Sequence, residues 1–119
     1  MKKLILTLLV ITAFTPIFAQ TDLAVNLCGN TENITKTQLL ECLEIQTNNK
    51  EWKIESFTFS CQVEGVMQEV SGTGNKISER MLFLINKFSP EKIYLEKFIL
   101  TNGEIKSDVV KPLILLVSY

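Results

Sequence analysis

Three cysteines, Cys28, Cys42 and Cys61, are the side chains of this sequence with the most reactive chemistry. They stand fourteen and nineteen positions apart, whereas the paired cysteine ligands of structural zinc sites have only two to four residues between them. The chain contains no histidine, which excludes the serine–histidine and cysteine–histidine nucleophile pairs. The cysteines are therefore expected to be small packing residues, with at most one disulfide among them.

Two pairs of closely spaced glutamates, Glu41 with Glu44 and Glu64 with Glu69, are the next candidates for chemistry. Two carboxylates on either side of a sugar linkage can hydrolyse it, one as the acid and the other as base or nucleophile. Singly spaced glutamates of this kind are more typical of a solvated surface. We predict no catalytic, cofactor-binding or metal-ligating residue, and we do not expect the chain to be an enzyme.

The glycine-rich segment 71–75 has the composition of a phosphate-binding loop. Such a loop continues into a Lys-Ser or Lys-Thr pair at the start of a helix, and no such pair follows here. The segment is therefore predicted to be an ordinary connection, and no cofactor is expected.

The first nineteen residues have the three-part layout of a secretory signal peptide. Lys2 and Lys3 give a positive start, residues 4–14 form an apolar run, and Ala19 supplies a small residue before the cut. This run is too short to span a hydrocarbon core, which takes about 20 residues. We predict cleavage between Ala19 and Gln20, a location in the periplasm or outside the cell, and no membrane span after cleavage.

Residues 20–119 are predicted to form a single domain, because their number is close to the common size for one hydrophobic core. Without Lys2 and Lys3 the chain has ten basic and thirteen acidic side chains, and therefore a net charge of −3. The basic side chains are scattered singly, without the stripe or run that nucleic acid or an anionic membrane attracts. Neither is expected as a partner.

Capping signals followed by apolar spacing indicate two short helices. Thr35 and Gln38 have the spacing of a capping box, which predicts a helix over residues 36–43. Ser78 is a suitable N-cap for a second helix, which is expected to end before Pro90 because the residue preceding a proline disfavours helical geometry. The apolar stripe of the second helix consists of Met81, Leu82, Leu84, Ile85 and Phe88.

The rest of the domain shows the alternation and the turn signals of short β-strands. The strands are expected at residues 23–27, 52–63, 66–70, 92–100, 105–110 and 113–117. In the second of these, Trp52 and Ile54 have the opposite parity to Phe57. A bulge near Glu55 and Ser56 is therefore expected to keep all the large side chains inside.

Strand 92–100 is expected to have two apolar faces and to lie in the middle of a layered structure. One face holds Tyr94, Glu96, Phe98 and Leu100, and the other holds Ile93, Leu95 and Ile99. The Asn102-Gly103 pair that follows predicts a hairpin with a type I′ turn, in which both residues take positive φ.

The residues predicted to form the centre of the core are Phe57, Phe59, Leu84 and Phe98. Cys61 shares the strand face of the first two and is expected to be buried. Cys28 follows the first strand, whereas Cys42 falls in the first helix near its leucines. We therefore expect a disulfide, if one forms, to join Cys28 to Cys61.

Short strands with frequent turn signals and two small helices favour a mainly β, antiparallel two-layer architecture. The order of the elements resembles the C-terminal domain of the gliding-motility protein GldM. The matching pieces are residues 34–39 (ITKTQL), 54–59 (IESFTF), 75–78 (NKIS), 92–98 (KIYLEKF), 102–105 (NGEI) and 112–113 (PL). The resemblance implies an immunoglobulin-like β-sandwich in the periplasm, without catalytic residues.

In the full-length family protein, such domains belong to a dimeric shaft of the gliding and type IX secretion machinery. That protein also has a transmembrane anchor and further periplasmic domains, which we do not find in this chain. The resemblance therefore implies the domain without implying the motor role.

Three functional hypotheses follow. The first is a non-enzymatic protein-interaction or structural module of the bacterial envelope, with envelope proteins as partners and a link to gliding motility or type IX secretion. The alternative is a small secreted hydrolase or an enzyme inhibitor, of which the hydrolase requires a deep pocket with two carboxylates about 5–10 Å apart. The third is self-association into a homo-oligomer through unpaired sheet edges.

Overall fold

A computed structural model describes residues 23–119, so the predicted cleavage between Ala19 and Gln20 lies outside the described residues. The described chain is mainly β with two helices, as expected. The strands are β1 (Val25–Leu27), β2 (Asn33–Thr35), β3 (Ile45–Thr47), β4 (Lys53–Val63), β5 (Val66–Thr73), β6 (Lys92–Thr101), β7 (Lys106–Ser107) and β8 (Leu113–Ser118). The helices are α2 (Lys36–Glu41) and α3 (Glu79–Phe88).

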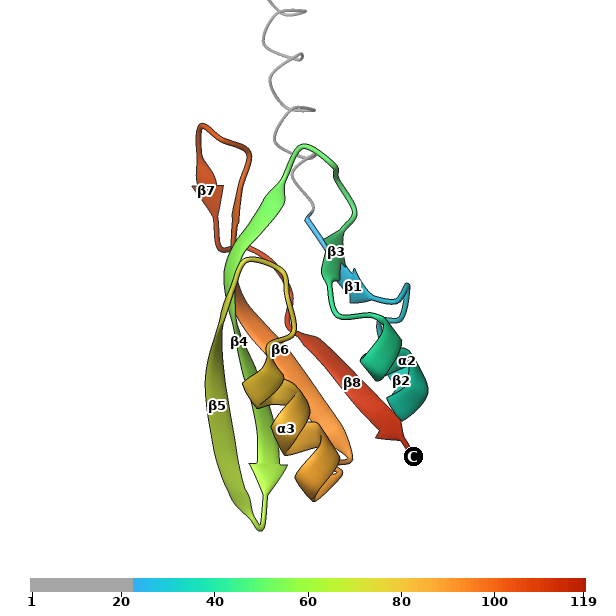
Figure 1. Cartoon of the computed structure of the whole chain (residues 1–119). Helices are drawn as coiled ribbons and strands as arrows, with labels where there is room; N and C mark the ends of the chain where they lie inside the picture. Colours follow the sequence, from blue (N-terminus) through green and yellow to red (C-terminus); the bar gives the residue numbers. More distant parts are fainter. Residues whose placement is uncertain (1–22) are drawn as a thin grey trace, which may run out of the picture.

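Six of the strands form the main sheet (Figure 1). Five of them follow the order β2-β8-β6-β4-β5, and β7 pairs with the end of β6. The strands β1 and β3 form a separate antiparallel pair. The expectation of an antiparallel architecture is wrong for one pair of strands, because β2 and β8 pair in parallel. Parallel neighbours need a long connection, and here most of the domain lies between the two strands.

The main sheet has one covered face. Helix α3 packs on β4, and Figure 1 shows it in front of the sheet, with the β1–β3 pair and α2 beside β8. The buried side chains of all these elements form one hydrophobic cluster. We call the face of the main sheet that carries its buried side chains the inner face, and the opposite one the outer face.

The predicted centre of the core is confirmed. Phe57, Phe59, Leu84 and Phe98 are all at least 97% buried, and the rings of Phe57 and Phe98 stack with centroids 5.9 Å apart. Cys61 is also fully buried on the inner face of β4. Helix α3 contributes Met81, Leu84 and Ile85 from its apolar stripe.

Both long strands of the sheet centre change parity at a bulge. The predicted bulge in β4 is confirmed, because the register with β6 shifts across Glu55. A second shift lies at Lys97 of β6, whose φ of 54° is left-handed. The predicted assignment of Phe98, Leu100 and Ile99 to the two faces of β6 is therefore wrong, whereas the predicted position of β6 away from the sheet edge is confirmed. The extra residue moves Phe98 and Leu100 onto the same buried face as Ile93 and Leu95.

The hairpin after β6 is present, but its predicted type I′ turn is not. Only Gly103 of the pair has a positive φ, and four residues connect Thr101 to Lys106. The side-chain oxygen of Asn102 accepts hydrogen bonds from the backbone of Glu104 and Ile105, each at 2.9 Å. This side-chain turn replaces the tight backbone turn, and the return strand β7 is much shorter than the expected 105–110.

Type I′ geometry occurs instead at two other turns. Cys28 and Gly29 have φ values of 59° and 77°, and Glu64 and Gly65 have values of 50° and 83°. In both turns an ordinary residue holds the first left-handed position and glycine the second. At Glu64 and Gly65 the sheet register requires this conformation. These two residues have to connect strands that pair without interruption from Ser56 to Val63 of β4.

Both helix starts are confirmed. Thr35 and Gln38 form the predicted capping box, with both hydrogen bonds at 3.1 Å, and Ser78 caps α3. Helix α2 ends earlier than expected, because Cys42 leaves helical geometry with ψ of 89°. Helix α3 ends at Ser89 in a left-handed conformation, directly before Pro90 as predicted.

The glycine-rich segment is only partly a connection, which corrects its prediction. Strand β5 continues through Thr73, so Gly72 lies in the strand opposite Phe57. A Cβ atom at Gly72 would stand 2.4–2.9 Å from atoms of the Phe57 ring. The ring therefore occupies the space that any other residue at this position would need.

Replacement of Gly72 by alanine is expected to lower the free energy of unfolding by about 1–3 kcal/mol, because the buried Phe57 ring has to leave its packed position. Chemical denaturation measures the change. Ser71→Ala is the matched control in the same strand, because Ser71 is exposed and a substitution there is expected to change stability by less than about 0.5 kcal/mol. A Gly72→Ala protein as stable as the control would contradict the packing.

Candidate functional site

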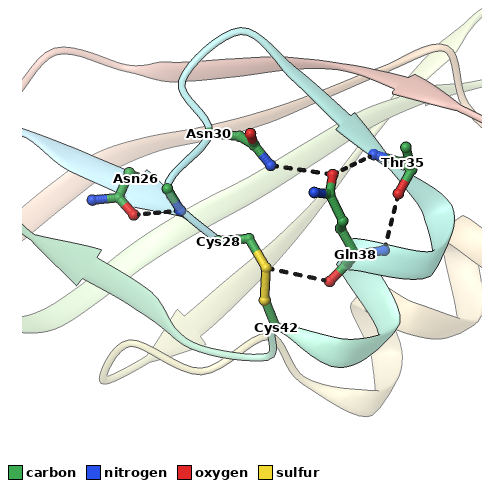
Figure 2. Close-up of a disulfide and its surroundings, with 7 residues drawn as sticks. Asn26, Cys28, Asn30, Thr35, Gln38 and Cys42 are labelled. Atoms are coloured by element: carbon green, nitrogen blue, oxygen red, sulfur yellow. Dashed lines mark hydrogen bonds between the residues drawn. A yellow bond between two sulfur atoms is a disulfide. The ribbon is translucent and has the colours of Figure 1, made fainter.

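The disulfide of this chain joins Cys28 to Cys42 (Figure 2). Their Cα atoms are 5.6 Å apart, within the range that a disulfide bridges. Cys28 occupies the first position of the tight turn after β1, and the side chain of Asn26 accepts a hydrogen bond from the Gly29 backbone at 2.9 Å. Cys42 ends α2. The bridge therefore fastens the tip of a β-turn to the end of a helix.

Gln38 holds the start and the end of α2 in place around this bridge. Its side-chain oxygen accepts hydrogen bonds from the Thr35 backbone at 3.1 Å and from the Asn30 side chain at 3.2 Å. Its carbonyl oxygen accepts the Cys42 amide at 2.8 Å and lies 3.9 Å from the Cys28 sulfur. Figure 2 shows both groups of contacts converging on this one residue.

The expected Cys28–Cys61 bridge is wrong. Cys61 lies in the middle of β4 among core side chains and remains a free, buried cysteine. Burial raises the pKa of the Cys61 thiol above its usual value, which lowers the fraction of reactive thiolate. The sequence argument failed because it treated Cys42 as a packing residue inside the helix. In the structure α2 ends at Glu41, and Cys42, the next residue, lies within reach of Cys28.

The two glutamate pairs lie in different surroundings. Glu41 and Glu44 are exposed and line an open hollow of about 410 Å³ beside the disulfide. Glu64 lies in the turn between β4 and β5, and Glu69 projects from the outer face of β5, 3.9 Å from Lys97. Within residues 23–119, no group of three or more histidine, cysteine, aspartate or glutamate side chains is placed to hold a metal ion.

An exposed apolar patch lies on the outer face of the main sheet. Tyr94 of β6 stands directly opposite Ile114 of β8, and Leu116 follows Ile114 on the same face. Strand β8 alternates between buried and exposed positions. Its outward residues Ile114 and Leu116 are each 46% exposed. We call these three residues the outer patch. The sequence showed only that strand 113–117 is apolar throughout. That continuous apolar run was the signal for the patch, because every second residue of a strand with one buried face points outward.

A hollow of about 470 Å³ adjoins the outer patch at the end of the sheet. Tyr94 belongs to both, and Lys92 and Gln62 supply the hollow with polar groups. The segment from Phe88 to Glu91 also lines the hollow. Together the patch and the hollow give this end of the outer face an apolar surface next to a polar depression.

The wall of this hollow is held by Tyr119. Its hydroxyl donates a hydrogen bond to the carbonyl oxygen of Pro90 at 2.7 Å. Burial, with a smaller contribution from Cys61, raises the pKa of the Tyr119 hydroxyl to about 12. A tyrosine hydroxyl with its ordinary pKa of about 10 is already protonated at neutral pH, so it is available as the donor with or without this shift.

Ser60 lies beside the patch, between Glu69 and Tyr94 in the sheet. It is 1% exposed, and its hydroxyl has no hydrogen-bond partner in the part of the chain that the structure describes. On the outer face, this small residue is flanked by the larger side chains of Glu69 in β5 and Tyr94 in β6.

No family model matches the chain, and no curated protein matches it. None of the helices within residues 23–119 is long and apolar enough to cross a membrane.

Proposed function

We propose that this chain is an exported, non-enzymatic interaction module of the bacterial envelope, with an immunoglobulin-like β-sandwich fold like that of the GldM C-terminal domain. The observation that carries the proposal is the outer patch. Exposed, contiguous apolar side chains on a small domain mark protein–protein contacts, and Ile114 and Leu116 remain 46% exposed on a sheet whose other face is packed.

Two further observations support export. The signal-like segment 1–19 precedes the domain, and the Cys28–Cys42 bridge is of the kind that persists in oxidising compartments. Sequencing the N-terminus of the protein from the envelope fraction tests this part. We expect Gln20 as the first residue, and a chain that still begins at Met1 would contradict export with cleavage.

The partner we propose is an envelope protein that covers the outer patch with an apolar surface and reaches into the adjoining hollow. A photo-crosslinking residue placed at Ile114 in exporting cells is expected to capture one defined envelope protein. Ile114→Glu and Leu116→Glu are each expected to weaken the binding of this chain to the purified partner at least roughly tenfold, as substitutions at the centre of an interface do.

Val109→Glu is the matched control for these variants. Val109 is 78% exposed and apolar, but it lies after β7, away from the outer patch. Thermal denaturation confirms that each variant is folded. Equal loss of binding in Val109→Glu, or unchanged binding in both patch variants, would contradict the outer patch as the interface.

The link to gliding motility and type IX secretion is supported by the collinear pieces of the GldM resemblance. Deletion of the gene in its own host tests this link. We expect slower spreading on a surface or reduced release of type IX cargo, and unchanged motility and secretion would restrict the proposal to a general envelope module.

A further inference from the structure

Strand β5 lies at one edge of the main sheet, and β4 is its only partner among the described strands (Figure 1). The type I′ turn makes Val63 and Val66 a hydrogen-bonded pair. From Val66 onward, every second residue of β5 therefore directs its backbone groups toward β4. The residues whose N–H and C=O groups point away from β4 are Met67, Glu69, Ser71 and Thr73.

This edge has only one of the features that protect sheet edges from pairing, the charged side chain of Glu69. Natural edge strands carry lysine, proline or a bulge, or are very short. Strand β5 has eight residues and contains neither lysine nor proline, and its register with β4 is unbroken. Within residues 23–119, the four outward residues make no backbone hydrogen bond to a loop or a cap.

We propose that β5 pairs with the same strand of a second copy of this chain, antiparallel about a two-fold axis at Val70. In this register Met67 faces the partner's Thr73, and Glu69 faces the partner's Ser71. All four outward residues of each copy then form hydrogen-bonded pairs. The inference goes beyond the proposed function, because it concerns self-association and requires no envelope partner.

The charges of β5 favour this register over its neighbour. Glu69 is the only charged residue of the strand. An axis at Glu69 would place that residue opposite its own copy, and like charges directly opposite each other destabilise a sheet. An axis at Val70 instead places a serine hydroxyl opposite each carboxylate. It also uses all four outward residues, whereas an axis at Glu69 pairs only three.

The inner face of β5 has room for this arrangement. Helix α3 packs on β4, which leaves Val66 of β5 58% exposed and Val70 half-buried. In the pair, the two β4 strands stand three strand spacings apart, or about 14 Å, whereas a helix with its side chains is about 10–12 Å across. The two α3 helices therefore fit side by side, with the valines of both β5 strands covered between them.

Sedimentation equilibrium of the exported, purified protein tests the proposal, together with hydrogen exchange at low and high protein concentration. We expect a concentration-dependent dimer in which the amides of the four outward residues become protected. Ser71→Glu places two pairs of like charges at the centre and is expected to raise the dimer dissociation constant roughly fivefold. Ser71→Lys, its matched opposite, places each lysine against a glutamate and is expected to preserve the dimer.

Several results would overturn the inference. One is a chain that stays monomeric at every concentration up to the millimolar range. Another is a dimer whose four outward amides exchange freely, and a third is a dimer that responds equally to glutamate and lysine at Ser71. A dimer that Ile114→Glu disrupts and Ser71→Glu leaves intact would assign self-association to the outer patch and also overturn pairing through β5. Loss of binding to an envelope partner bears only on the proposed function.

Discussion

Replacement of Phe59 by alanine is expected to lower the free energy of unfolding by about 3–5 kcal/mol, the largest effect of any single substitution considered for this chain. Phe59 is fully buried at the centre of β4, between Val70 of β5 and Leu95 of β6. A small domain has only about 5–15 kcal/mol of stability in total, so the variant is expected to be partly unfolded at moderate temperature. Urea denaturation measures the change.

Gln62→Ala is the matched control in the same strand. Gln62 is exposed on the outer face, so its truncation is expected to change stability by less than about 0.5 kcal/mol. A change below about 1 kcal/mol for Phe59→Ala would mean that the two faces of β4 are assigned the wrong way round.

Removal of the disulfide is expected to have the second largest effect, a loss of about 3 kcal/mol in the double variant Cys28→Ser/Cys42→Ser. The bridge closes a loop between residues fourteen positions apart, and in the chain-entropy account it limits the freedom of the unfolded chain. Denaturation of the oxidised protein and of the variant measures the difference. Reductant is expected to destabilise the natural chain and to leave the variant unchanged.

Thiol counting on the unfolded, unreduced protein checks the same bridge. One free thiol is expected, and peptide mapping is expected to assign it to Cys61. Three free thiols would contradict the bridge, and a mapped pair that includes Cys61 would contradict its position. In the native protein, Cys61 is expected to be inert to thiol reagents, because it is buried and its pKa is raised.

The sequence by itself determined the elements that depend on near neighbours. The capping box of Thr35 and Gln38 needs only residues three apart, and the stop at Pro90 needs only the next residue. Alternation within β4 identified Phe57 and Phe59 as core residues, because successive side chains of a strand point to opposite faces. The odd parity of Ile54 was also enough to predict the bulge at Glu55.

Only the tertiary structure decided the features that join distant parts of the chain. The bulge at Lys97 depends on how β6 meets β4, so the assignment of Phe98 and Ile99 to faces could not be derived from β6 alone. The partner of Cys28 depended on where α2 ends relative to the turn at Cys28 and Gly29. The outward direction of Ile114 and Leu116 followed from the sheet that buries the other side of β8. Local sequence patterns contain no information about how distant elements are placed relative to one another. Each of these features depends on that placement.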